Sequence, residues 1–143
     1  DDFALSRAAL CVLFLFPMGA DVFAYFTGVL LGRHKLCPHI SPNKTVEGAA
    51  GGFIGVAVAG IAIWLLGRYV FDFALPVAHL IALGVLCGIV GPLGDLCESA
   101  LKRAFSVKDS GKLFGAHGGA LDRADSWMAC TPVVLGYFLL FII

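Results

Sequence analysis

Four side chains that could bind a metal ion and a phosphate stand at helical spacing where an apolar stretch ends. Asp95, Ser99 and Lys102 are separated by four and then three residues, so a helix places them on one face, with Glu98 beside them. A carboxylate one turn from a hydroxyl and two turns from a lysine suits a metal ion whose bound phosphate reaches the lysine. An ordinary solvated helix end is the alternative. We favour the site, because an ionisable group at the border of a membrane segment is costly and usually functional.

A pair of aspartates, Asp122 and Asp125, opens the last apolar stretch. Their spacing of three puts both carboxylates on one helical face, away from Arg123. Aspartates at a helix start also cap the helix and interact with its dipole, but one aspartate would serve that purpose. Since Mg²⁺ prefers carboxylate oxygens together with waters and phosphates, we predict Asp95 and Asp122 as the main metal ligands. Asp125 and Glu98 are the next candidates.

Two further segments could bind an anion through backbone N–H groups. The glycines of His117-Gly118-Gly119 allow an anion-binding concavity, although such a pair is often only a turn. In the other polar segment, Ser41 suits the N-cap and Pro42 the first position of the second apolar helix. The free N–H groups of that helix start, with Lys44 and Thr45 nearby, form an anion site. Capping alone would explain the serine and the proline but not the lysine and the threonine.

The remainder of the chain is mostly apolar and predicts a membrane protein. Of its 143 residues, 59% are hydrophobic and 14% are charged, whereas soluble domains carry about 25% charged residues. A membrane-crossing helix needs roughly 20 apolar residues, and four stretches qualify, at about residues 8–31, 48–71, 75–96 and 126–143. We therefore predict an all-α, polytopic bundle of four transmembrane helices. Asp21 lies within the first span, where a carboxylate is either functional or part of a helix-to-helix hydrogen bond.

The placement of charge predicts the orientation of this bundle. Eight of the ten lysines and arginines fall in two polar loops, at about residues 32–47 and 97–125, and only Arg7 and Arg68 lie elsewhere. Two spans separate the loops, so both lie on one face, and excess positive charge marks that face as cytoplasmic. Glycines four residues apart, such as Gly51 and Gly55, let helices approach closely, either within the bundle or across a homodimer.

The polar positions together resemble a known signature. Ser99-x-x-Lys102-Arg103, Lys108-Asp109-x-Gly111 and His117-Gly118-Gly119-x-x-Asp122-Arg123-x-Asp125 look like the signature of phosphatidate cytidylyltransferases, also called CDP-diacylglycerol synthases. Upstream, Asp21, His34-Lys35-Leu36 and Ser41-Pro42-x-Lys44-Thr45-x-Glu47-Gly48 are similar to the preceding region of that family. The resemblance implies that residues 1–143 are the C-terminal catalytic membrane domain of a longer protein.

The same resemblance implies a reaction in phospholipid biosynthesis: CTP and phosphatidic acid give CDP-diacylglycerol and pyrophosphate. It implies Mg²⁺, with a second cation such as K⁺ nearby. Positive groups would neutralise the triphosphate, and polar groups would orient phosphate oxygens. The catalytic candidates are Lys44, Ser99, Lys102, Arg103, Lys108 and Asp109. The substrate-binding candidates are Asp21, Ser41, Lys44, Thr45, His117, Gly118, Gly119 and Arg123.

Three alternatives remain open at this stage. A CTP-dependent lipid kinase of the dolichol kinase type shares part of the motif, and would release CDP instead of pyrophosphate. An anion transporter would place its site near the bilayer midplane, whereas nearly all charge here lies at one surface. A dimerisation scaffold would leave the aspartates unexplained. We expect a bacterial inner-membrane protein that acts at the cytoplasmic face as a homodimer, with no nucleic-acid partner.

Overall fold

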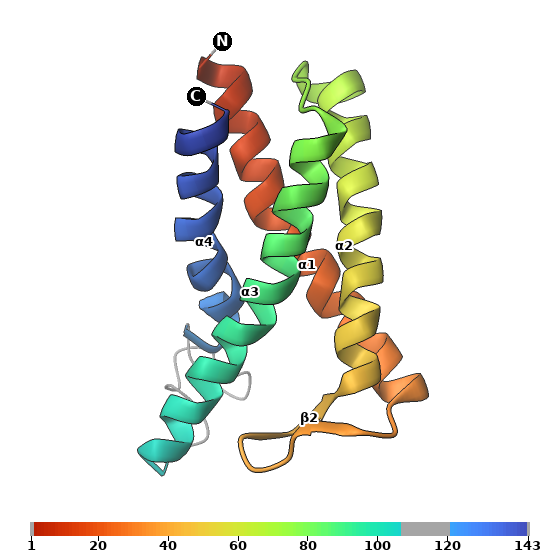
Figure 1. The fold of residues 1–143 in the computed structure, drawn as a ribbon, viewed down its shortest axis with the longest axis vertical. Helices are drawn as coiled ribbons and strands as arrows, with labels where there is room; N and C mark the ends of the chain where they lie inside the picture. The colour runs from red at the N-terminus through yellow and green to blue at the C-terminus, as the bar shows by residue number, and fades with distance from the viewer. Residues whose placement is uncertain (1, 107–120, 143) are drawn as a thin grey trace.

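Four long helices make up most of the part of the chain that the structure describes. The computed structural model describes residues 2–106 and 121–142, without the side chains of residues 2 and 121–123. The helices are α1 (Asp2–Leu31), α2 (Val46–Leu66), α3 (Val77–Ala104) and α4 (Leu121–Phe141), and they stand side by side in a bundle (Figure 1). Each contains a stretch that is long and apolar enough to cross a membrane. The predicted polytopic helical bundle is confirmed.

The helix ends differ from the predicted spans in ways that matter for the site. α3 continues through its charged end to Ala104, as the spacing of its polar residues predicts. α4 starts at Leu121, so Asp122 and Asp125 occupy its first turns. α2 is prolonged by one stretch of π-helix, η1 (Gly67–Phe71), which ends where Asp72 takes a left-handed conformation with φ 52°.

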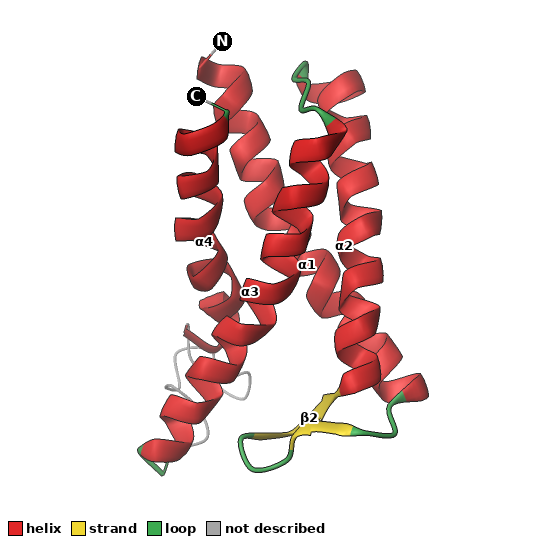
Figure 2. Cartoon of the chain, viewed as in Figure 1, coloured by secondary structure: helices red, strands yellow, loops and turns green. Residues whose placement is uncertain are grey.

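A short β-hairpin, which the sequence analysis did not predict, precedes α2. Strand β1 (Lys35–Cys37) pairs antiparallel with β2 (Ser41–Thr45), and the hairpin is the yellow element in Figure 2. The prediction that Ser41 caps the second helix is wrong, because Ser41 pairs with Cys37 in the hairpin. The N-cap is Thr45, whose extended backbone ends β2 and whose Oγ1 accepts the N–H of Gly48 at 3.0 Å.

Small residues determine how the helices pack. α1 and α2 form the most extensive interface and α3 and α4 the next, while each interface between a helix of one pair and a helix of the other is smaller. A side chain added at Gly19 would come within 2.7 Å of the carbonyl oxygen of Gly55, and one added at Gly51 would overlap Thr27. The glycines of these helices are therefore used in packing within one chain, which confirms the first of the two interpretations.

Polar segments gather at one end of the bundle. The hairpin and the C-terminal end of α3 lie at that end, whereas both chain termini and the connection from η1 to α3 lie at the other (Figure 1). The expected meeting of the two polar loops at one end is confirmed for the hairpin and for α3. Residues 107–120 lie outside the described part of the chain.

Candidate functional site

Three carboxylates from two helices converge at the polar end of the bundle. Asp95 and Glu98 come from α3 and Asp125 from α4, and each offers an oxygen that lies within 4.8 Å of the other two. We call these three residues the acid cluster. Glu98 is 8% exposed, and Asp95 and Asp125 are partly buried. Three acidic side chains are thus held together where water is scarce.

The close approach of α3 and α4 brings the acid cluster together. Gly94 faces α4, and a side chain at this position would overlap Cβ of Ala129 and come within 3.2 Å of the carbonyl oxygen of Asp125. Gly91, one turn earlier, faces Cys130 and Ser126. Because these glycines have no side chain, the backbones of α3 and α4 lie close together at the level where the three carboxylates project from the helices.

Lys44 reaches the acid cluster from β2, on the opposite pair of helices. Its Nζ forms an ion pair with Oδ2 of Asp95 and donates to the carbonyl oxygen of Pro92 at 3.4 Å. The lysine side chain is 24% exposed and the Asp95 side chain 33% exposed, so water screens the pair only in part. A cation from the hairpin therefore balances part of the negative charge of α3.

Glu47 holds the hairpin that carries Lys44. Its carboxylate accepts the backbone N–H groups of Arg33 at 3.1 Å and His34 at 3.2 Å, and it contacts Nδ1 of His34 at 2.7 Å. The sequence analysis quoted Glu47 within a motif but gave it no role. An acidic residue in the first turn after a threonine N-cap was the available signal, since it indicates a structured helix start.

The C-terminal turns of α3 supply a hydroxyl and a second cation. Oγ of Ser99 lies 3.5 Å from Oδ1 of Asp95, and Nζ of Lys102 lies 3.5 Å from Oε1 of Glu98. The predicted grouping of these four side chains is therefore present. Arg103 is exposed in the last turn of α3, and it forms no ion pair with a residue that the structure describes.

Asp21 approaches the same region from α1. Asp95, Asp125 and Lys44 lie within electrostatic range of the Asp21 carboxylate, and the side chain of Ser126, which is 4% exposed, lies near it. Ser126 also donates its backbone N–H to Oδ1 of Asp125 at 2.7 Å. Three helices therefore contribute to the region, and Asp21 is exposed on its outer side.

Other candidate residues lie elsewhere or outside the described residues. Thr45 is 7% exposed and uses its hydroxyl as the helix cap, and Ser41 is part-exposed at the start of β2; whether either binds substrate stays a prediction. The backbone of α4 places Asp122 one turn before Asp125, as predicted. The remaining candidates fall outside the described residues: Lys108, Asp109, His117, Gly118, Gly119 and the side chains of Asp122 and Arg123.

The acid cluster fits the donor set of a divalent cation. Two carboxylates about 4 Å apart repel each other by about 4 kcal/mol at an effective dielectric constant near 20, and a cation between them would relieve that repulsion. Adjacent ligands of an octahedral Mg²⁺ lie about 3.0 Å apart and opposite ligands about 4.2 Å apart. The three carboxylate oxygens lie within 4.8 Å of one another, so rotations of these side chains would let them share one ion. Lys44 and Lys102 lie beside these oxygens and could contact the phosphates of a metal-bound nucleotide.

Comparisons with known proteins identify the family of the chain. The cytidylyltransferase family model matches residues 4–141. A phosphatidate cytidylyltransferase of Bacillus subtilis (strain 168) is 48% identical over 120 residues, which are 84% of this chain and 42% of that protein. One from Staphylococcus haemolyticus (strain JCSC1435) is 44% identical over 121 residues, or 85% of this chain and 45% of that protein. The chain spans less than half the length of these curated relatives.

Proposed function

Since the chain belongs to the cytidylyltransferase family, we propose that it carries the catalytic part of a phosphatidate cytidylyltransferase. The reaction transfers the cytidylyl group of CTP to phosphatidic acid, giving CDP-diacylglycerol and pyrophosphate. The relatives from Bacillus and Staphylococcus bear that name. The observation that carries the proposal is the acid cluster with its two lysines, at the end of a membrane bundle.

The chemistry needs positioning and charge neutralisation more than a strong base. A phosphate oxygen of phosphatidic acid attacks the α-phosphorus of CTP, and the bond from that phosphorus to the β-phosphate oxygen breaks to release pyrophosphate. The attacking oxygen is ionised near neutral pH, so no side chain has to remove its proton. Transfers of this kind are accelerated by alignment and by cations near the developing charge.

The residues of the site divide these tasks. Asp95, Glu98 and Asp125 would hold Mg²⁺, which when bound supplies positive charge next to the nucleotide phosphates. Lys44 and Lys102 would neutralise phosphate oxygens, in exchange for their present carboxylate partners. Asp122, which its spacing predicts as a main metal ligand, stays part of the proposal, as does a second cation such as K⁺, which the family resemblance implies.

The membrane position of the site follows from the same geometry. A lipid substrate keeps its acyl chains in the bilayer, so its phosphate can reach only a site near the end of the spans. The hairpin and the end of α3 carry Arg33, Lys35, Lys44, Lys102 and Arg103, which by the positive-inside rule favours the cytoplasm for this end. We propose the bacterial cell membrane as its location. A homodimer stays a prediction, because the described glycines pack within one chain.

Product analysis tests the function. Membranes that contain the protein would be incubated with phosphatidic acid, Mg²⁺ and CTP labelled at either the α- or the γ-phosphate. Label from the α-position should enter the lipid, and label from the γ-position should leave in pyrophosphate. Diacylglycerol, which lacks the attacking phosphate, is the control acceptor and should give no product. Lipid labelled from the γ-position, with CDP released, would instead identify a lipid kinase and contradict the proposal.

A further inference from the structure

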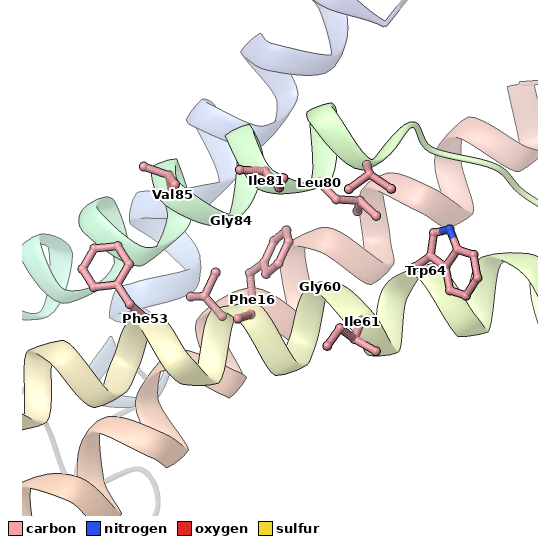
Figure 3. A pocket seen from close by; sticks show the side chains of 12 residues that line it. Phe16, Phe53, Gly60, Ile61, Trp64, Leu80, Ile81, Gly84 and Val85 are labelled. Atoms are coloured by element: carbon pink, nitrogen blue, oxygen red, sulfur yellow. The ribbon is translucent and has the colours of Figure 1, made fainter.

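An apolar groove runs between α2 and α3 in the half of the bundle away from the acid cluster. It has a volume of about 450 Å³, and Phe16 of α1 lies between the two helices at its base (Figure 3). Phe53 and Trp64 mark its two ends along α2. They are 11 positions apart, so the groove is about 16 Å long at 1.5 Å per residue. This length is about half of the 30 Å hydrocarbon core of a bilayer and matches the depth of one leaflet.

A second cavity with charged walls continues the groove at its outer end. Its volume is about 480 Å³, and Arg68, Tyr69 and Asp72 line it. Trp64 and Leu80 line both cavities, so the apolar groove and the polar cavity adjoin each other. Together the two adjoining cavities offer an apolar part of acyl-chain length and a polar part at the level of lipid headgroups.

The polar cavity lies at the membrane surface opposite the acid cluster. Thr45, which ends the hairpin, and Arg68 are 23 positions apart along one nearly continuous helix. A rise of 1.5 Å per residue places Arg68 about 35 Å from the hairpin, which is close to the thickness of a bilayer. Trp64 and Tyr69 stand at this end, where amphipathic aromatic rings favour the headgroup level.

Two opposite charges face this cavity without pairing with each other. Arg68 and Asp72 are exposed, and neither forms an ion pair with a residue that the structure describes. The guanidinium carbon of Arg68 lies 6.0 Å from the ring centroid of Trp64, which holds the cation at the mouth of the apolar groove. One fixed cation and one fixed anion complement a headgroup that carries a phosphate and an ammonium group.

We propose that this site binds one phospholipid with an ethanolamine headgroup from the leaflet opposite the acid cluster. The lipid phosphate contacts Arg68, its primary ammonium group donates to Asp72, and one acyl chain lies in the groove over Phe16. A choline headgroup lacks the N–H donors for the aspartate. An anionic glycerol headgroup brings no cation to it. A helix of another chain would have to bury both charges, which costs free energy unless each finds a partner.

Quenching of Trp64 fluorescence by lipids with brominated acyl chains tests the proposal, because bromine quenches only on contact. The full protein would be reconstituted with brominated ethanolamine, choline or glycerol phospholipid at equal mole fractions. The Trp64→Phe variant measures the signal of all other tryptophans, which is subtracted. We expect the ethanolamine lipid to quench Trp64 at about a threefold lower mole fraction than the other two, the effect of one or two partly exposed charge contacts.

Variants of the two charges separate recognition from simple contact with lipid. Arg68→Gln and Asp72→Asn should each nearly abolish the preference for the ethanolamine lipid. Arg33→Gln, which removes an arginine at the other end of the bundle, should keep that preference. Equal quenching by all three lipids would overturn the proposal. A preference for the glycerol lipid would show that the assignment of a lipid ammonium group to Asp72 is wrong. Absence of quenching by any lipid would mean that a protein segment or a second copy covers the groove.

Discussion

Lys44 and a divalent cation should compete for Asp95. Removing the lysine should therefore raise the affinity for Mg²⁺ and at the same time lower turnover. In the structure the lysine occupies Oδ2 of Asp95, an oxygen that a metal ion in the acid cluster would need. Lys44→Gln removes that competitor and leaves the three carboxylates with less compensating charge. We therefore expect the variant to bind Mg²⁺ more tightly in the absence of nucleotide, although its turnover falls because a phosphate contact is lost.

The size of the effect follows from the geometry of the pair. An ion pair with side chains 24% and 33% exposed is worth more than the 0.2–1 kcal/mol of a surface pair, yet it remains far below the upper bounds of a dry interior. About 1.4 kcal/mol is a reasonable middle value and corresponds to about tenfold in affinity. The dissociation constant for Mg²⁺ should therefore fall by about tenfold in Lys44→Gln.

Calorimetric titration of the purified protein with Mg²⁺ measures this directly, and initial rates over a range of CTP concentrations measure the loss of turnover. Lys35→Gln is the matched control, because Lys35 lies on the same hairpin and forms no ion pair with a described residue; it should leave both quantities near those of the parent protein. Unchanged or weaker Mg²⁺ binding in Lys44→Gln would refute the reasoning that the cation and the lysine share Asp95.

Four further substitutions test other parts of the site. Asp95→Asn and Asp125→Asn should each lower turnover by at least ~10²-fold at saturating Mg²⁺, because charge stabilisation by a metal is worth several kcal/mol; near-normal rates would remove the acid cluster from the reaction. Gly94→Val should force α3 and α4 apart and cost about 1–3 kcal/mol of stability, seen as a lower midpoint of thermal unfolding in detergent and as weaker Mg²⁺ binding. Glu47→Gln loosens the hairpin that holds Lys44 against Asp95, so it should lower turnover and tighten Mg²⁺ binding in the same direction as Lys44→Gln, but by less; weaker Mg²⁺ binding would contradict this.

The parts of the structure that depend on local pattern could be predicted from the sequence. Four apolar stretches predicted the membrane helices. The spacing of Asp95, Ser99 and Lys102 predicted that α3 continues past its apolar part, to Ala104, with these residues on one face. Both follow from helical periodicity, which is a property of neighbouring residues. The preference of Mg²⁺ for carboxylates gave Asp95 and Asp122 as main ligands and Asp125 and Glu98 as the next candidates. The structure brings Asp95, Glu98 and Asp125 together, whereas the side chain of Asp122 lies outside the described residues.

The parts that depend on long-range contacts could not be predicted in the same way. Ser41 and Pro42 carry a strong helix-start pattern, yet strand pairing with Cys37 overrides it and moves the start of α2 to Val46. The ion pair of Lys44 with Asp95 joins segments 51 positions apart, and no local pattern specifies such a partner. The choice of Asp125 for the described cluster depends on the rotation of α4 against α3, which Gly94 determines through packing.

The division of the bundle into two pairs of consecutive helices also bears on how the protein is made. Domains and segments that leave the ribosome first fold first, and membrane helices associate after they have inserted. α1 and α2, with their extensive glycine interface, can therefore associate before α3 and α4 are synthesised. The like charges of α3 and α4 then arrive beside a lysine that is already in place. In this order of assembly, the acidic groups of α3 and α4 would meet with Lys44 already present to balance part of their charge.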